Sequence, residues 1–163
     1  MGTIIAAAAL AISFCSLVVS IYFWSRSFRP IVTAVVKTHA AGNEKIAYDL
    51  VVLNSGTLPA RNIRITAAEN WLGAALGRDT SEENKQKWLA CFNNQGIVLL
   101  HNNDRVSCSF GTTEANDAGF WKYDATIPVM ITYEGWFGKK YKETQNIKIS
   151  DSNSFTGYFW GIP

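Results

Sequence analysis

The chain opens with a long apolar run that is typical of a membrane-spanning helix. From Thr3 to Trp24 no residue is charged, and the first charged side chain is that of Arg26. A helix of this length would span about 33 Å at ~1.5 Å per residue, against a hydrocarbon core of roughly 30 Å. A helix also satisfies its own backbone hydrogen bonds in lipid. The pattern predicts a transmembrane anchor within residues 1–28, ending shortly before Pro30.

The end of this run has the composition of a membrane interface. Aromatic rings prefer the headgroup level, and Lys and Arg collect on the cytoplasmic side. Because no Lys or Arg precedes the run, this rule predicts a single-pass protein of the cell (inner) membrane with a cytoplasmic domain. The predicted interface residues are Tyr22, Trp24, Arg26 and Arg29.

Other roles for the apolar run fit its residues less well. A cleaved signal peptide normally has a positive start and a small-residue cleavage site, but this run starts neutral and exits through Tyr-Phe-Trp. A lipoprotein would need a small residue before Cys15, where Phe14 stands, and myristoylation would need Ser or Thr in place of Ala6. We therefore expect a permanent anchor.

Small residues recur on one face of the predicted helix. Such a stripe lets a second helix approach closely, so packing against another membrane protein or a second copy of this chain is one interpretation. Chance is the other, because an alanine-rich helix produces such stripes without selection. The helix-packing candidates are Gly2, Ala6, Ala9, Ser13, Ser16 and Ser20.

Residues 29–150 change to short apolar runs separated by turn residues. Runs rich in Val and Ile, some alternating with polar residues, are typical of strands. About seven such strands with few helices indicate a mainly β domain built as an antiparallel sandwich. The expected strands are Ile31–Thr38, Ile46–Leu53, Asn62–Thr66, Ile97–Leu100, Arg105–Phe110, Ile127–Tyr133 and Lys139–Ile149.

One helix is expected in the long connection between the third and fourth strands. Thr80 and Glu83 fit a capping box, and a helix over Ser81–Phe92 would follow. A long insertion is either functional or a cover for the end of a sheet, and we favour the cover. The expected buried residues of this helix are Trp88, Leu89 and Phe92.

Two aromatic segments are candidates for contact with a partner. The stretch 112–123 is irregular, and the tail 151–163 is too apolar for a free linker. The tail would pack back on the domain, touch the membrane surface or dock a partner. The candidate partner-binding residues are Trp121, Phe155, Tyr158, Phe159 and Trp160.

Composition excludes several classes of function. With 48% apolar and 17% charged residues, the 163-residue chain can bury a core, and a net charge of +2 does not favour nucleic-acid binding. The sequence has no Cys-x-x-Cys pair, no Gly-x-Ser-x-Gly and no phosphate loop, and His39 lies far from His101. We therefore expect no enzyme, no metal and no cofactor.

Two groups of polar residues each have two interpretations. Cys91 and Cys108 would be buried thiols in the cytoplasm, or a disulfide if the domain lay outside it. Lysines on the last hairpin would mark the exposed face of an edge strand, where lysine prevents unwanted pairing. The alternative is a basic patch near anionic lipid headgroups. These lysines are Lys139, Lys140 and Lys142.

The turn Asn54–Asn62 and the last hairpin together resemble a known group of proteins. The turn has the pattern Asn-x-Gly-x-x-Pro-Ala-x-Asn, and Gly138, Lys139 and Tyr141 follow an Ile-x-Tyr strand. This resembles small bacterial and phage proteins of unassigned function, which have a single-pass membrane helix and an immunoglobulin-like β-sandwich. The resemblance covers about residues 3–149 and implies this fold, with no catalytic residue.

Physical chemistry gives the turn residues expected roles of their own. Gly56 can adopt a positive φ, and Pro59 fixes the chain before the next strand. Asn54 and Asn62 can bond nearby backbone groups.

The expected function is protein interaction at the membrane by an anchored, non-catalytic domain. The first alternative is an accessory subunit of a larger membrane complex, packing through its transmembrane helix. A small-ligand binder or enzyme using the Trp-rich loops is the less favoured alternative.

Overall fold

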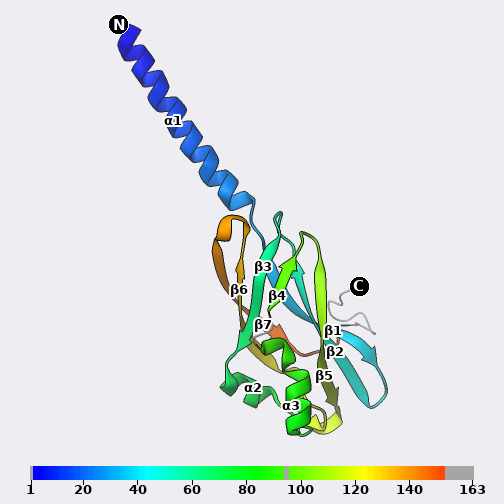
Figure 1. The fold of residues 1–163 in the computed structure, drawn as a ribbon. Coiled ribbons are helices and arrows are strands. Elements are labelled where there is room, and N and C mark those ends of the chain that lie inside the picture. Colours follow the sequence, from blue (N-terminus) through cyan, green and yellow to red (C-terminus); the bar gives the residue numbers. More distant parts are fainter. Residues whose placement is uncertain (1, 94–95, 153–163) are drawn as a thin grey trace.

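A computed structural model, which describes residues 2–93 and 96–152, has one long helix followed by a mainly β domain (Figure 1). Helix α1, Gly2–Ser27, is long and apolar enough to span a membrane. Against the part of the chain that the structure describes, none of its residues is buried. The helix ends three residues before Pro30, as the steric restriction before proline predicts.

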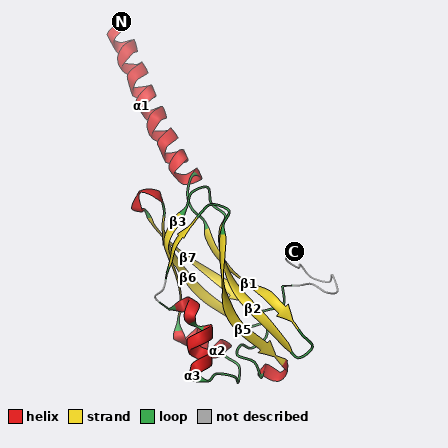
Figure 2. Ribbon diagram, turned by 45° about the vertical axis from the view of Figure 1, so that its right-hand side comes forward, coloured by secondary structure: helices red, strands yellow, loops and turns green. Residues whose placement is uncertain are grey.

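The described residues form seven strands in two antiparallel sheets, which confirms the predicted fold class (Figure 2). The sheet orders are β1-β2-β5 and β4-β3-β6-β7. In a constant-type immunoglobulin domain the fourth strand belongs to the sheet of the first, second and fifth; here it pairs with the third. The strands are β1 Val32–Ala41, β2 Lys45–Asn54, β3 Ala60–Ala67, β4 Ile97–Leu100, β5 Arg105–Glu114, β6 Thr126–Glu134 and β7 Lys140–Lys148.

The core lies between the two sheets and follows the alternation in the sequence. On β6, Ile127, Val129 and Ile131 are buried while the residues between them are partly exposed. Strand β1 repeats this pattern at its start. Burying one such side chain contributes roughly 1.5–3 kcal/mol, so the period-2 pattern specifies which face of each sheet points inward.

A glutamine side chain joins the two sheets along one edge of the sandwich. Gln145 on β7 accepts a hydrogen bond from the amide of Ala34 (2.9 Å) and donates one to the carbonyl of Val32 (3.2 Å). Its amide group thus satisfies backbone groups of β1 that face away from β2, as a neighbouring strand would do.

The insertion between β3 and β4 packs against β3, β5 and β6 at the end of the sandwich away from α1 (Figure 1), which is the predicted cover for a sheet end, but its described residues contain two α-helices. Helix α2, Glu69–Ala75, was not expected, and α3, Glu82–Trp88, is shorter than predicted and is followed by the 3₁₀ turn Ala90–Phe92. The N-cap is also different: the Ser81 hydroxyl accepts from the Asn84 amide at 3.2 Å, in place of the expected Thr80 cap. The residues that pack against the core from this insertion include Trp88, Leu89 and Phe92.

Candidate functional site: the helix junction, the last hairpin and the outer sheet face

The chain passes from α1 into the sandwich through a short linker, residues 28–31. This linker is hydrogen-bonded to the turn between β2 and β3. The Thr57 amide donates to the Arg29 carbonyl (3.1 Å), and the Ser55 amide donates to the Ile31 carbonyl (2.9 Å). The Thr57 hydroxyl also donates to the carbonyl of Ser27, the last residue of α1 (3.4 Å). The exit from the helix is therefore fixed to the domain by backbone groups.

The side chain of Asn54 is at the centre of this junction and is fully buried. Its Oδ1 accepts hydrogen bonds from the amides of Ile31 (3.1 Å) and Gly56 (3.0 Å). Its Nδ2 donates to the carbonyls of Leu58 (2.8 Å), Leu100 (3.3 Å) and His101 (3.2 Å). One side chain thus connects the linker, the β2–β3 turn and the β4–β5 turn by hydrogen bonds.

Gly56 is required by close packing, and the expectation of a positive φ there is wrong. The positive φ in this motif belongs to Asn62, at 51°. A Cβ at position 56 would collide with the carbonyl oxygen of Arg29 and lie 2.6 Å from the Cα of Pro30. Only glycine lets the linker backbone lie this close to the turn.

We expect Gly56→Ala to detach the linker from the turn while leaving the two sheets formed. In hydrogen exchange of the full chain, the amides of Ile31 and Thr57 should lose at least tenfold in protection, because their bonding partners move apart. Gly73→Ala is the control, since nothing lies within 4 Å of a Cβ there. Unchanged protection of both amides would contradict this account of the junction.

The hairpin between β6 and β7 lies beside the last turn of α1 (Figure 1). A cavity of about 120 Å³ separates them, and Trp24 and Phe28 line it from the helix end while Trp136 and Lys139 line it from the hairpin. Trp136 remains 48% exposed, and the guanidinium carbon of Arg61 lies 5.1 Å from the centroid of its ring. The hairpin end of the sandwich is therefore both aromatic and cationic.

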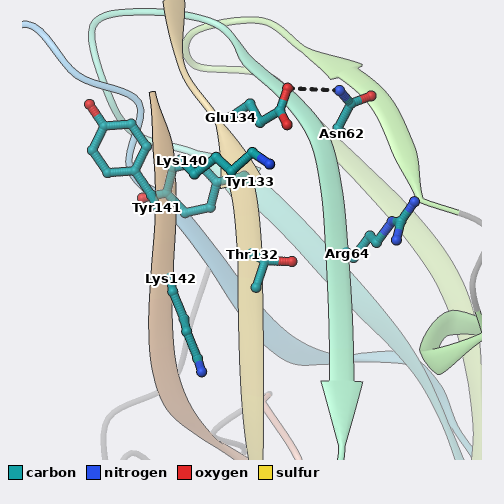
Figure 3. A pocket seen from close by; sticks show the side chains of 8 residues that line it. All are labelled: Asn62, Arg64, Thr132, Tyr133, Glu134, Lys140, Tyr141 and Lys142. Carbon is teal, nitrogen blue, oxygen red and sulfur yellow. Dashed lines mark hydrogen bonds between the residues drawn. The ribbon is translucent and has the colours of Figure 1, made fainter. Parts of the chain in front are cut away.

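The outer face of β3, β6 and β7 carries further cations around a hollow of about 620 Å³ (Figure 3). Lys140 and Lys142 are exposed on β7, which is at the edge of the described sheet, as predicted; this position fits both interpretations of the lysines. Asn62 donates to the Glu134 carboxylate at 3.0 Å. Figure 3 shows that the side chains of Arg64 and Lys142 point apart. The hollow thus combines three cationic side chains with one carboxylate that is already hydrogen-bonded.

The structure leaves the predicted residues of α1 on an exposed helix surface. The helix-packing candidates are exposed, and the Ser13 hydroxyl donates back to the Ala9 carbonyl (2.9 Å). Tyr22, Trp24 and Arg26 are exposed at the helix end, where the Arg26 guanidinium carbon lies 5.4 Å from the Tyr22 ring centroid. Packing against another helix and contact with a membrane interface therefore stay predictions.

Trp121 is a core residue, so its assignment as a partner-binding residue is wrong. It is 0% exposed, stacks on Phe110 at 4.9 Å and meets the edge of Phe120 at 4.8 Å. Its indole N–H donates to the Phe110 carbonyl. The other partner-binding candidates lie outside the described residues: Phe155, Tyr158, Phe159 and Trp160.

The two thiols of the domain are free and line one small apolar cavity, of about 270 Å³. Burial, followed by the charge of Cys108, raises the pKa of the Cys91 thiol to about 12. Burial, followed by the charge of Asp49, also raises the pKa of Cys108. Within residues 2–93 and 96–152, no group of three or more potential metal ligands occurs.

We expect Cys91 to react about a thousandfold more slowly with iodoacetamide at pH 8 than the same cysteine in urea, because only the thiolate attacks. Mass spectrometry of the alkylated peptides measures both rates. The raised pKa also predicts a pH effect: an unfolded thiol ionises near pH 8.5 and the folded one does not, so stability falls as pH rises from there towards 12. Equal rates in the folded and unfolded chain would contradict the prediction.

Comparison with known proteins adds a family but no activity. A family model described as "Domain of unknown function (DUF8453)" matches residues 1–153. No curated protein and no solved structure matches the chain. The matched range includes α1, the junction and all seven described strands. The chain belongs to this family of domains of unknown function.

Proposed function

We propose that this protein is a single-pass membrane protein whose β-sandwich contacts another protein at the membrane surface without catalysing a reaction. The observation that carries the proposal is the junction around Asn54, which bonds the exit of α1 directly to the sandwich. A domain held in this way cannot tumble freely about its anchor. Its surfaces would meet membrane partners in one orientation, which raises effective concentration and lowers the entropic cost of binding.

The described surface supports contact with an extended partner better than chemistry on a small substrate. The hollow of about 620 Å³ is open, and the Arg64 and Lys142 side chains that line it point apart. Strand β4, by contrast, is at the edge of its described sheet and exposes Val98 (77%) and Leu99 (42%). An edge strand with unpaired backbone groups and exposed apolar side chains can accept a strand from another chain.

Cross-linking in native membranes tests the proposal. The full chain with a photo-reactive residue in place of Val98 should give a discrete protein adduct, and the same residue in place of Tyr123, which is 51% exposed, serves as the control. The chain should sediment with membranes and retain its N-terminal helix by mass spectrometry. A soluble chain, or a mature form starting after Trp24, would refute the anchor.

The cytoplasmic orientation is part of this proposal and has its own test. A cysteine introduced as Val98→Cys should be labelled by a membrane-impermeant maleimide only after cells are opened. The unmodified chain gives the background from the native thiols. Labelling of Val98→Cys in intact cells would place the sandwich outside the cytoplasm.

An accessory subunit of a membrane complex is the second proposal, supported by the stripe of small residues exposed on α1. Cross-links from position Ser13 to one constant membrane protein, with none from position 98, would favour it. Substituting Ser13 by leucine should then release that neighbour, while Leu10→Ile on another part of the helix should not.

A further inference from the structure

We propose that the hairpin between β6 and β7 is a second membrane contact, which takes anionic lipid headgroups beside the anchor. The inference rests on the proposed membrane anchorage. The contact surface consists of Trp136 and Lys139 of the hairpin with Arg61, Lys140 and the helix exit 26–29.

Position is the first argument. The apolar part of α1 ends at Trp24, and its length matches the hydrocarbon thickness, so the residues just after it lie at the headgroup level. Trp136 and Lys139 line the same small cavity as Trp24 and Phe28. Because the linker is bonded to the sandwich, the hairpin is held at this level beside the helix.

Side-chain chemistry is the second argument. Trp136 is 48% exposed, and its indole, an apolar ring with one polar N–H edge, is suited to the interface. Phe28, which is 44% exposed, adds an apolar ring beside it. Arg61 lies over the Trp136 ring at 5.1 Å, so the cation and the aromatic form one amphipathic surface. The described cations of the contact surface are Arg26, Arg29, Arg61, Lys139 and Lys140.

Charge is the third argument and selects the lipid. Two acidic side chains lie near these cations, and both already accept a hydrogen bond: Glu134 from Asn62 and Glu143 from the Tyr133 hydroxyl (2.7 Å). The five cations are exposed and outnumber these two carboxylates, and they belong to the end of the sandwich that carries α1, which Figure 1 shows. Cations placed within a Debye length of a bilayer favour anionic over zwitterionic headgroups.

Photo-cross-linking of the full chain in lipid nanodiscs tests the contact. Benzophenone side chains are placed at Trp136, at Trp71 and at Leu10. Trp71 is the matched control because it is 49% exposed and belongs to α2, at the end of the sandwich away from α1. We expect lipid adducts from positions 10 and 136 and none from position 71.

The adduct yields at positions 10, 71 and 136 distinguish failure of the membrane anchor from failure of the hairpin contact. Adducts from position 10 without adducts from position 136 would overturn the hairpin contact and leave the anchor intact. An absence of lipid adducts from position 10 would overturn the anchor itself. Equal yields from positions 136 and 71 would show that the hairpin has no special place at the bilayer.

A comparison of lipids tests the charge argument. Adding phosphatidylglycerol to phosphatidylcholine discs should raise the adduct yield from position 136 several-fold. Lys139→Gln with Lys140→Gln should abolish most of that rise, since each cation near an anionic surface contributes a factor of about five. Lys85→Gln with Lys87→Gln in α3 removes the same charge and should change nothing. Equal yields in both lipids would overturn the headgroup assignment.

Discussion

Asn54→Ala is expected to destabilise the sandwich by roughly 3–5 kcal/mol, because it leaves several buried backbone groups without a partner. The amides of Ile31 and Gly56 lose their shared acceptor. Three carbonyls also lose the two N–H donors of Nδ2 that they share. Since alanine brings no replacement and the site is closed to water, each lost bond counts at close to its desolvation cost.

Chemical unfolding of the full chain in detergent, followed by tryptophan fluorescence, measures this loss. Asn62→Gly is the control from the same motif: Asn62 is exposed, its side chain donates to one carboxylate, and glycine accepts the φ of 51° found there without strain, so we expect a change within about 0.5 kcal/mol. Asn54→Asp should be at least as damaging as alanine, because a carboxylate would face the same carbonyl oxygens. A similar small effect at both asparagines would refute the central role of Asn54.

Trp121→Ala is expected to cost about 3–5 kcal/mol, as large aromatic deletions in cores do. The indole packs against Phe110 and Phe120 and is fully buried. Its removal would leave a cavity between β5 and the segment leading into β6, together with an unpaired carbonyl at Phe110. Loss of partner binding in this variant would therefore follow from unfolding.

The same unfolding experiment distinguishes this role from a surface role. Trp71→Ala removes an indole that is 49% exposed, so we expect it to cost well under 1 kcal/mol. A Trp121→Ala protein as stable as the unmodified chain, yet deficient in cross-linking to a partner, would restore the surface assignment.

Strands and the long helix followed from local patterns in the sequence. Strands β1 and β6 alternate with a period of two because one face of each is buried. Helix α1 follows from an unbroken apolar run that is long enough to form a helix. The helices of the insertion were less predictable. Both span seven residues, and such short helices depend on packing against the core more than on their own propensity.

Roles of individual residues depended on contacts between distant segments. Asn54 and Asn62 occur in one motif, yet one is buried at three converging segments and the other lies at the surface. Trp121 and Trp136 are both in non-strand connections, yet one fills the core and the other borders the helix exit. Residue type alone cannot separate such pairs.

The sequence by itself therefore determined a long apolar helix, a seven-stranded β domain and the faces that its strands bury. Each of these depends on the pattern of apolar and polar residues within one short segment. Only the tertiary structure decided that the β2–β3 turn holds the helix exit, that Gly56 allows this close approach and that the last hairpin lies beside α1. These features depend on which turns meet at one end of the sandwich, and that follows from the pairing of strands far apart in the chain.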